Sequence, residues 1–171
     1  ESQGVDIVLA NPPWGMKVDL YGKDHYPIPT SDSSSLFLQH AMSRLRTGGR
    51  AVILLPKSLL FRGGRERKLR QWLLQEHSVE AIIAIPRGAF TSQMSIETCL
   101  MIIRRGGGTK SVRIVNAESI FKKAVKSKTD PAANAVAREL CDRLQSPDQG
   151  DDWWDINVKN LAAFDFDLTP R

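Results

Sequence analysis

The sequence predicts an α/β fold with a mostly parallel β-sheet and an antiparallel strand near the edge of the sheet. Apolar runs of strand length alternate with segments whose apolar residues recur every three or four positions, the spacing of amphipathic helices. Prolines follow three of these runs and stop them, because proline cannot donate a ladder hydrogen bond. A chain of 171 residues is long enough for a domain with a sizeable core.

Five strands and four helices are expected along the chain. They are strands at residues 5–10, 50–55, 79–85, 98–103 and 112–115, and helices at residues 35–46, 64–76, 116–128 and 131–145. The first strand is expected to be buried and parallel, because its apolar run is nearly continuous. Ser34 or Ser35 is the expected cap of the first helix. Gly48 and Gly49 are expected to end it, because glycine accepts the left-handed conformation after a helix.

The third and fourth strands are joined by a connection too short for a crossover helix. We therefore expect these two strands to be antiparallel. The three glycines at residues 106–108 follow an antiparallel strand and precede another strand, which is the wrong context for a nucleotide-binding loop. Residues 15–35 form a long connection, which is expected to be either a loop that covers a substrate or a spacer.

The composition, 42% hydrophobic and 25% charged, is ordinary for a soluble globular protein. No apolar run reaches the roughly 18 residues of a membrane helix, and no signal peptide is visible, so we expect no membrane contact. Cys99 and Cys141 are expected to be small core residues, and their small number favours the reducing cytoplasm. No Cys/His spacing indicates zinc, so no metal site is predicted.

Positive charge is concentrated in the middle of the chain, between residues 44 and 70, whereas the region after residue 129 is acidic. Within the helix at residues 64–76, we expect Arg65, Lys68 and Arg70 to be available to solvent. This distribution indicates either a surface that faces phosphates or a solvated basic helix face.

The sequence Asn11-Pro12-Pro13-Trp14 follows the first strand directly. Ligands of open α/β sheets bind at the carboxyl ends of strands, and two prolines make this backbone stiff. The Asn11 side chain and the Pro12 carbonyl are two acceptors that suit an amino group with two N–H donors, and Trp14 offers a flat face for a base. The alternative is a turn that ends the strand, with Trp14 in the core.

This four-residue motif matches the (Asn/Asp/Ser)-Pro-Pro-(Tyr/Phe/Trp) motif of amino-group methyltransferases that use S-adenosylmethionine. Residues 35–75 and 79–103 resemble the corresponding stretches of adenine-N6 DNA methyltransferases, of the kind found as the modification subunit of type I restriction–modification systems. The ending at residues 165–171 is similar to that family's usual close. The resemblance implies the second half of a Rossmann-like sheet. Residues 1–115 would form the catalytic acceptor half, and 116–171 a helical C-terminal extension packed on it.

By this resemblance, Asn11, Pro12 and Pro13 belong to the catalytic motif, and Trp14 and Phe90 stack on either side of a flipped adenine. For Phe90, the alternative is a loop aromatic folded onto the core. Four cations are candidates for DNA phosphates or for a partner subunit: Arg62, Arg65, Lys68 and Arg70.

In the family, a Gly-rich cofactor loop and an acidic ribose ligand precede the motif, and this sequence begins after them. We therefore expect a fragment that binds S-adenosylmethionine weakly or not at all and is inactive alone. The expected partners are DNA, the N-terminal half of the methyltransferase domain, and specificity and restriction subunits. Two alternatives are a methyltransferase for protein glutamine or RNA, and an inactive DNA-binding or assembly module.

Overall fold

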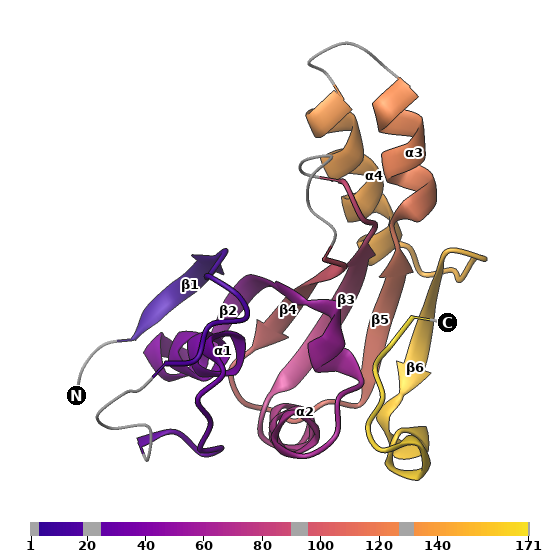
Figure 1. Ribbon diagram of the computed structural model, residues 1–171. Helices are drawn as coiled ribbons and strands as arrows, with labels where there is room; N and C mark the ends of the chain where they lie inside the picture. Colours follow the sequence, from indigo (N-terminus) through magenta and orange to yellow (C-terminus); the bar gives the residue numbers. More distant parts are fainter. Residues whose placement is uncertain (1–3, 19–24, 90–95, 127–131, 171) are drawn as a thin grey trace.

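The computed structural model describes residues 4–18, 25–89, 96–126 and 132–170 and contains one six-stranded mixed sheet (Figure 1). The strands are β1 (Val5–Ala10), β2 (Leu45–Pro56), β3 (Ser78–Ile85), β4 (Thr98–Arg104), β5 (Ser111–Asn116) and β6 (Trp153–Asn157). Their order is β1-β2-β4-β3-β5-β6. Strands β1, β2, β3 and β5 run in one direction, and β4 and β6 run against them. The predicted α/β class and the antiparallel pairing of β3 with β4 are confirmed.

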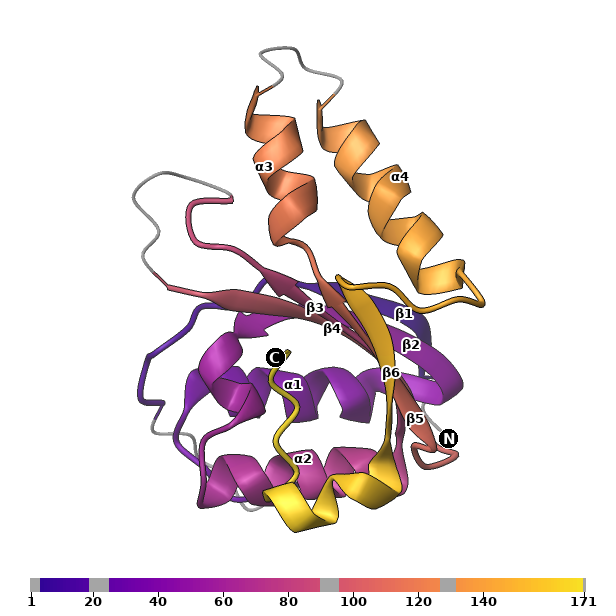
Figure 2. The ribbon, with the colours of Figure 1, turned by 90° about the vertical axis from the view of Figure 1, so that its right-hand side faces the viewer.

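Helices pack on both faces of this sheet, as Figure 2 shows. The helices are α1 (Ser33–Arg44), α2 (Arg65–Glu76), α3 (Glu118–Lys126) and α4 (Ala132–Gln145), with short 3-10 turns η2 (Lys57–Leu60), η3 (Val158–Asn160) and η4 (Ala162–Phe164). Helices α1 and α2 lie side by side under one face, whereas α3 and α4 stand together on the other side, near the carboxyl ends of β3 and β5, where Leu140 and Leu144 of α4 pack against the sheet (Figures 1 and 2). The expected C-terminal extension therefore also contains a strand, β6, which joins the sheet at β5.

The core has two parts because side chains alternate across the sheet. Ile53 and Leu55 of β2 belong to the larger cluster, which includes α1 and α2, and Leu54 between them belongs to the cluster on the other face. Cys99 is fully buried in the larger cluster, and burial raises the pKa of its thiol to about 12. Cys141 is exposed on α4, so the expectation that it is a core residue is wrong.

Strand β1 is parallel to β2, as predicted, but it is not buried. It lies at the edge of the sheet, and Val5, Ile7 and Leu9 are 45%, 63% and 75% exposed. These alternate residues share one face, which no described helix covers at this end of the sheet. The continuous apolar run led to the prediction of a buried strand, and it is the missing cover that makes the strand exposed here.

The start and end of α1 differ from the prediction. Asp32 caps the helix, because its carboxylate accepts a hydrogen bond from the Ser35 N–H at 2.9 Å. Gly48 and Gly49 do not end it, since the chain enters β2 directly after Arg44. Gly48 has a φ of 81°, and Gly49 lies so close to β1 that an added Cβ would sit 2.8 Å from the Asp6 carbonyl oxygen. Gly49 therefore permits the close approach of the two strands, and Gly48 permits the left-handed conformation beside it.

None of the helices in the described part of the chain is both long and apolar enough to cross a membrane. Across residues 4–18, 25–89, 96–126 and 132–170, no group of three or more His, Cys, Asp or Glu side chains is placed to hold a metal ion.

Candidate active site

The Asn11–Trp14 turn lies at the carboxyl end of β1. Asn11 is exposed and Pro12 is buried, so the turn is anchored on one side and open on the other. Ser33, the first residue of α1, fixes the turn through hydrogen bonds. Its hydroxyl donates to the Pro13 carbonyl at 3.0 Å and accepts from the Met16 N–H at 3.2 Å. The stiff motif is thus fixed to the helix that follows it.

Trp14 is half-buried and attached to the neighbouring strand. Its indole N–H donates to the Leu54 carbonyl of β2 at 3.1 Å, and its ring packs against the cluster that contains Leu54. The hydrogen bond fixes the orientation of the ring, because a buried indole N–H without a partner is costly. The sequence left open whether Trp14 is a core residue or a stacking surface, and its position at a cavity allows both.

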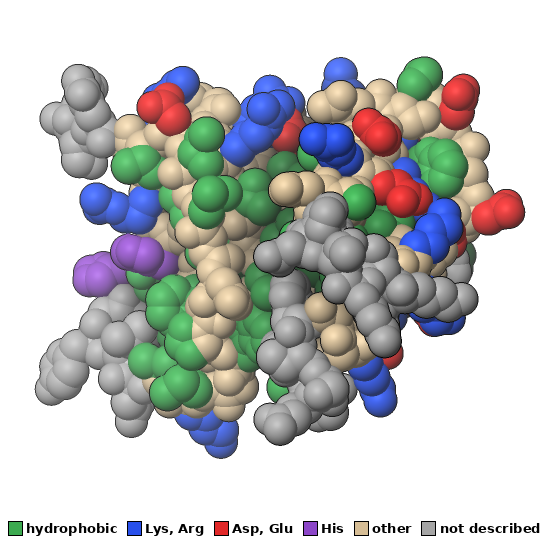
Figure 3. Space-filling model, turned by 90° about the horizontal axis from the view of Figure 1, so that it is seen from above, with side chains coloured by type: hydrophobic (Ala, Val, Ile, Leu, Met, Phe, Trp, Pro, Cys, Tyr) green, Lys and Arg blue, Asp and Glu red, His purple; other side chains and the backbone are tan. Residues whose placement is uncertain are grey.

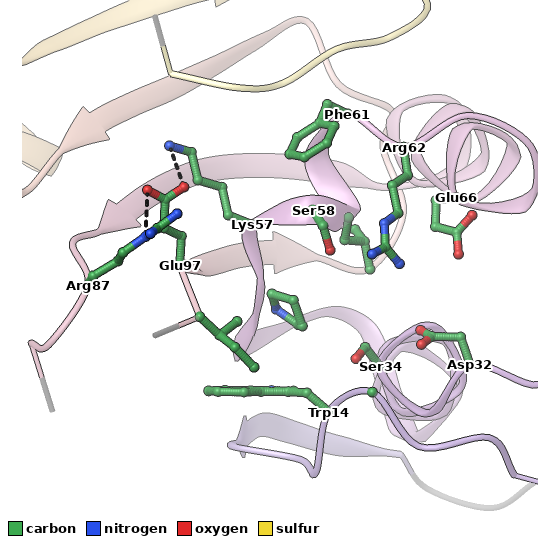
Figure 4. Close-up of a pocket in the computed structure, with 14 residues that line it drawn as sticks. Trp14, Asp32, Ser34, Lys57, Ser58, Phe61, Arg62, Glu66, Arg87 and Glu97 are labelled. Atoms are coloured by element: carbon green, nitrogen blue, oxygen red, sulfur yellow. Dashed lines mark ion pairs between the residues drawn. The ribbon is translucent and has the colours of Figure 1, made fainter. Parts of the chain in front are cut away.

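Trp14 lines a cavity of about 370 Å³ at the carboxyl edge of the sheet. Figure 4 shows Phe61 and Arg62 on the side opposite Trp14, and Asp32 and Ser34 at the start of α1 beside it. A cavity of this size suits one flat ring with part of its attached sugar. Its walls come from the ends of β1 and β2, from α1 and from η2, and those elements are far apart in the sequence.

An ion-pair cluster borders this cavity on another side (Figure 4). The Glu97 carboxylate forms ion pairs with Lys57 Nζ at 3.5 Å and with Arg87 Nε at 3.3 Å. The Lys57 N–H also donates to the Glu97 carbonyl at 2.9 Å, which joins the end of β2 to the segment before β4. Both cations also line a second cavity of about 380 Å³ that begins beyond them, next to α3. The ion-pair cluster therefore lies between the two cavities at the carboxyl edge of the sheet.

The basic residues that the sequence singled out are not all on the surface. Arg62 is exposed and lines the cavity, and Arg65 and Lys68 are exposed on α2. Arg70 is fully buried, so the expectation that it is available to solvent is wrong. Burial is the main cause that lowers the pKa of its guanidinium, and the nearby Asp167 carboxylate opposes this effect.

Two residues of the site were missed by sequence reasoning, and one predicted residue is not described. Phe61, which is 53% exposed, lines the cavity, and Ser33 holds the motif. An aromatic residue directly before an Arg-Gly-Gly turn is an indication that could have singled out Phe61. Phe90 lies outside the described residues.

The glycine-rich turn does not line the cavity at Trp14. The glycines at 106–108 lie between β4 and β5, at the amino edge of the parallel strands and so opposite Asn11. The glycine-rich turn and the cavity at Trp14 therefore lie at opposite edges of the sheet. Figure 3 looks down on the carboxyl edge and shows hydrophobic side chains gathered on the side of β1 and α1.

The chain is similar to known proteins over its whole length. A family model described as N-6 DNA methylase matches residues 1–171. The type I restriction enzyme EcoEI methylase subunit of Escherichia coli is 27% identical over 175 residues, which cover 96% of this chain and 35% of that protein. The chain thus spans about a third of the length of this curated relative.

Solved structures show the same fold. The methyltransferase subunit of a type I restriction–modification system from Streptococcus thermophilus has a TM-score of 0.77 at 25% identity, over 98% of this chain and 38% of that one. A putative class I S-adenosylmethionine-dependent methyltransferase from Listeria monocytogenes has a TM-score of 0.58 at 22% identity, over 82% of this chain and 42% of that one, and its likeness is one of fold.

Proposed function

Because the chain belongs to the N-6 DNA methylase family, we propose that it forms the acceptor side of a DNA methyltransferase that modifies the N6 amino group of adenine in a type I restriction–modification system. One observation carries this proposal. The rigid Asn11–Trp14 turn stands at the carboxyl end of β1, with Asn11 exposed and Trp14 on a cavity that fits a base.

The chemistry of the turn suits the amino group of adenine. In the described part of the chain, no hydrogen bond occupies the Asn11 side chain, so its amide oxygen is available to accept one N–H. The Pro12 carbonyl is the second acceptor. These two hydrogen bonds orient the amino nitrogen and increase the availability of its lone pair. S-adenosylmethionine, when bound, supplies a methyl group on a positively charged sulfur.

Stacking would hold the flipped base in this cavity. The amino group is paired in duplex DNA, so the target base must leave the helix at a cost of a few kcal/mol. The Trp14 ring is fixed by Leu54 and offers a preformed surface that offsets part of this cost. Phe90 stays our proposal for the aromatic on the other face of the base.

The start of α2 is suited to a DNA phosphate. Gly64 occupies the N-cap and provides no side-chain hydrogen bond, so the first N–H groups of the helix remain available to an anion. Arg65 and Lys68 are exposed at this end, where positive charge is unfavourable for the helix itself. Together with Arg62 they form the proposed phosphate contacts, and the buried Arg70 is no longer among them.

The open side of β1 indicates where the donor half of the enzyme belongs. Ile7 and Leu9 are mostly exposed on a strand whose outer edge pairs with no other described strand. We propose that the N-terminal half of the methyltransferase domain covers this face and carries most of the S-adenosylmethionine site. Titration calorimetry of the chain alone is then expected to show no binding of the cofactor in the micromolar range, and micromolar binding would contradict this assignment.

The remaining partners follow from the same proposal. In the cytoplasm, the enzyme would assemble with a specificity subunit that selects the DNA sequence and with a restriction subunit. The chain by itself is expected to be inactive, because we propose that most of the S-adenosylmethionine site belongs to the N-terminal half of the methyltransferase domain.

The test is methyl transfer by the full-length protein that carries this chain, with Asn11→Ala and the exposed α4 control Asn134→Ala. Radiolabelled methyl groups are offered with DNA, RNA or a protein release factor as acceptor. We expect labelling of adenine in DNA, a loss of about 10²–10³-fold in Asn11→Ala, and wild-type activity in the control. Labelling of RNA or of protein glutamine would replace the proposed substrate. An Asn11→Ala variant with unchanged function would indicate an assembly module.

A further inference from the structure

Arg70 is a buried cation whose contacts are made to the main chain. It lies on α2 with no exposed surface. Its Nη1 donates to the carbonyls of Leu59 at 2.8 Å and Arg62 at 2.7 Å. Its Nε donates to the Phe166 carbonyl at 2.8 Å, and its Nη2 to the Asp165 carbonyl at 3.1 Å. One planar guanidinium therefore binds four carbonyl groups.

These four carbonyls belong to two segments that lie about a hundred residues apart in sequence. Leu59 and Arg62 belong to the wall segment, residues 57–62, which includes η2 and lines the cavity. Asp165 and Phe166 belong to the C-terminal segment, residues 165–168, which runs beside α2 in Figure 2. The Leu168 N–H also donates to the Leu60 carbonyl at 3.0 Å, and Leu168 is fully buried.

The conformation of the C-terminal segment is unusual and depends on this contact. Asp165 and Phe166 have φ values of 54° and 56°, in the left-handed region that residues other than glycine rarely adopt. Such a conformation persists only where the surroundings impose it. An ion pair between Arg67 and Asp165, at 3.0 Å, adds a second link from α2 to the same segment.

We propose that Arg70 is a positioning residue for the DNA-facing wall of the cavity and that the C-terminal segment acts through it to set the places of Phe61 and Arg62. This inference rests on the proposed function of the cavity. A single 3-10 turn such as η2 has too few hydrogen bonds to hold its own position. The side chains of Phe61 and Arg62 are exposed. The backbone that carries them is fixed by the hydrogen bonds of Arg70 to the Leu59 and Arg62 carbonyls, so these bonds determine where the two side chains meet a ligand.

Lysine cannot replace the guanidinium fully. Lysine keeps the charge and has three donors, but it lacks the planar fork that reaches both segments at once. Methionine keeps the length of the side chain and has no donor. The two substitutions therefore form a graded series, with Arg70→Lys expected to be the milder.

The experiment compares Arg70→Lys, Arg70→Met and the control Lys110→Met in the full-length protein. Lys110 is an exposed cation just before β5, on the edge opposite the cavity. We expect Arg70→Lys to raise KM for DNA about tenfold and Arg70→Met to raise it further. The affinity for S-adenosylmethionine is expected to change less than twofold, and the control to match the wild type. Wild-type KM in both Arg70 variants, or a loss of kcat in proportion to unfolded protein with KM unchanged, would overturn the proposal.

Hydrogen exchange gives a second measurement that does not depend on activity. In the wild type, the amides of residues 57–62 and 165–168 are expected to be protected together, and in Arg70→Lys both segments should lose protection together. Loss in one segment alone would contradict the inference. If the wild-type protein does not methylate DNA, the proposed function fails, whereas coupled exchange would still establish the link between the two segments.

Discussion

Single residues outside the Asn-Pro-Pro-Trp motif determine the position and orientation of the motif. The Ser33 hydroxyl donates to the Pro13 carbonyl of the turn and accepts from the Met16 N–H just after it, and the Ser33 N–H donates to the Met16 carbonyl at 3.0 Å. Trp14 is fixed in the same way by one carbonyl of β2. The two prolines make the turn stiff, but these contacts determine where the stiff turn lies.

We expect Ser33→Ala to destabilise the protein by about 1–2 kcal/mol, because it leaves the Pro13 carbonyl and the Met16 N–H without their partner. Methyl transfer should fall as the turn loosens. Urea denaturation of the full-length variant measures the first effect. The matched control is Ser43→Ala on the exposed side of the same helix, where the hydroxyl donates only to the His40 carbonyl one turn earlier. Equal losses in both variants would show that Ser33 has no special role.

Arg70 shows why a charged residue can be misplaced from sequence. Leu69, Leu73 and Leu74 are buried on α2, and residue 70 lies three and four positions before the last two. Helical spacing alone therefore puts Arg70 next to the buried face. Its charge suggested exposure instead. The carbonyls that stabilise the buried charge come from outside α2, so the local sequence pattern does not show them.

At the scale of elements, the contact between β1 and β2 depends on a residue without a side chain. An added Cβ at Gly49 would lie 2.8 Å from the Asp6 carbonyl oxygen and 3.1 Å from the Arg46 carbonyl oxygen. The two strands can approach each other here only because this space is empty. Since β1 carries the motif at its carboxyl end, the register of this pair also sets the position of Asn11.

Gly49→Ala is therefore expected to destabilise the protein by about 1–3 kcal/mol, because strand β1 must move away from β2. Thermal or urea denaturation measures the change, and hydrogen exchange should increase in β1. Gly63→Ala is the control, because no atom lies within 4 Å of its added Cβ and its φ is not in the left-handed region. This control should change stability by no more than about 1 kcal/mol. Comparable losses at both positions would argue against the close-approach explanation.

At the scale of the whole molecule, charge and open apolar surface lie at different places. The exposed cations Arg62, Arg65 and Lys68 lie at the start of α2 or just before it, whereas the uncovered apolar face belongs to β1. The proposed phosphate-facing surface and the proposed face for another part of the protein are thus kept apart. The net charge of +5 favours association with DNA, and its effect must weaken with salt.

This arrangement predicts the salt dependence of DNA binding. In the full-length protein, the double variant Arg65→Gln/Lys68→Gln should lower the affinity for DNA of any sequence. The slope of log K against log salt should fall by about 2, since each phosphate contact contributes about 0.9. The control Arg46→Gln/Lys110→Gln removes the same charge from exposed positions on the amino edge and should leave the slope nearly unchanged. Equal slopes for the two double variants would refute the phosphate role of α2.

The sequence by itself determined the order of strands β1 to β5 and of the four helices, the antiparallel pair and the motif at the end of β1, but not strand β6. These features depend on local spacing and on prolines, which act on the residues beside them. Only the tertiary structure decided that β1 is exposed, that Arg70 is buried and that Phe61 shares a cavity with Trp14. The reason is the distance along the chain: the Trp14 hydrogen bond joins residues 40 positions apart, and the Arg70 bond to Phe166 joins residues 96 positions apart. Periodicity within one element cannot specify such contacts.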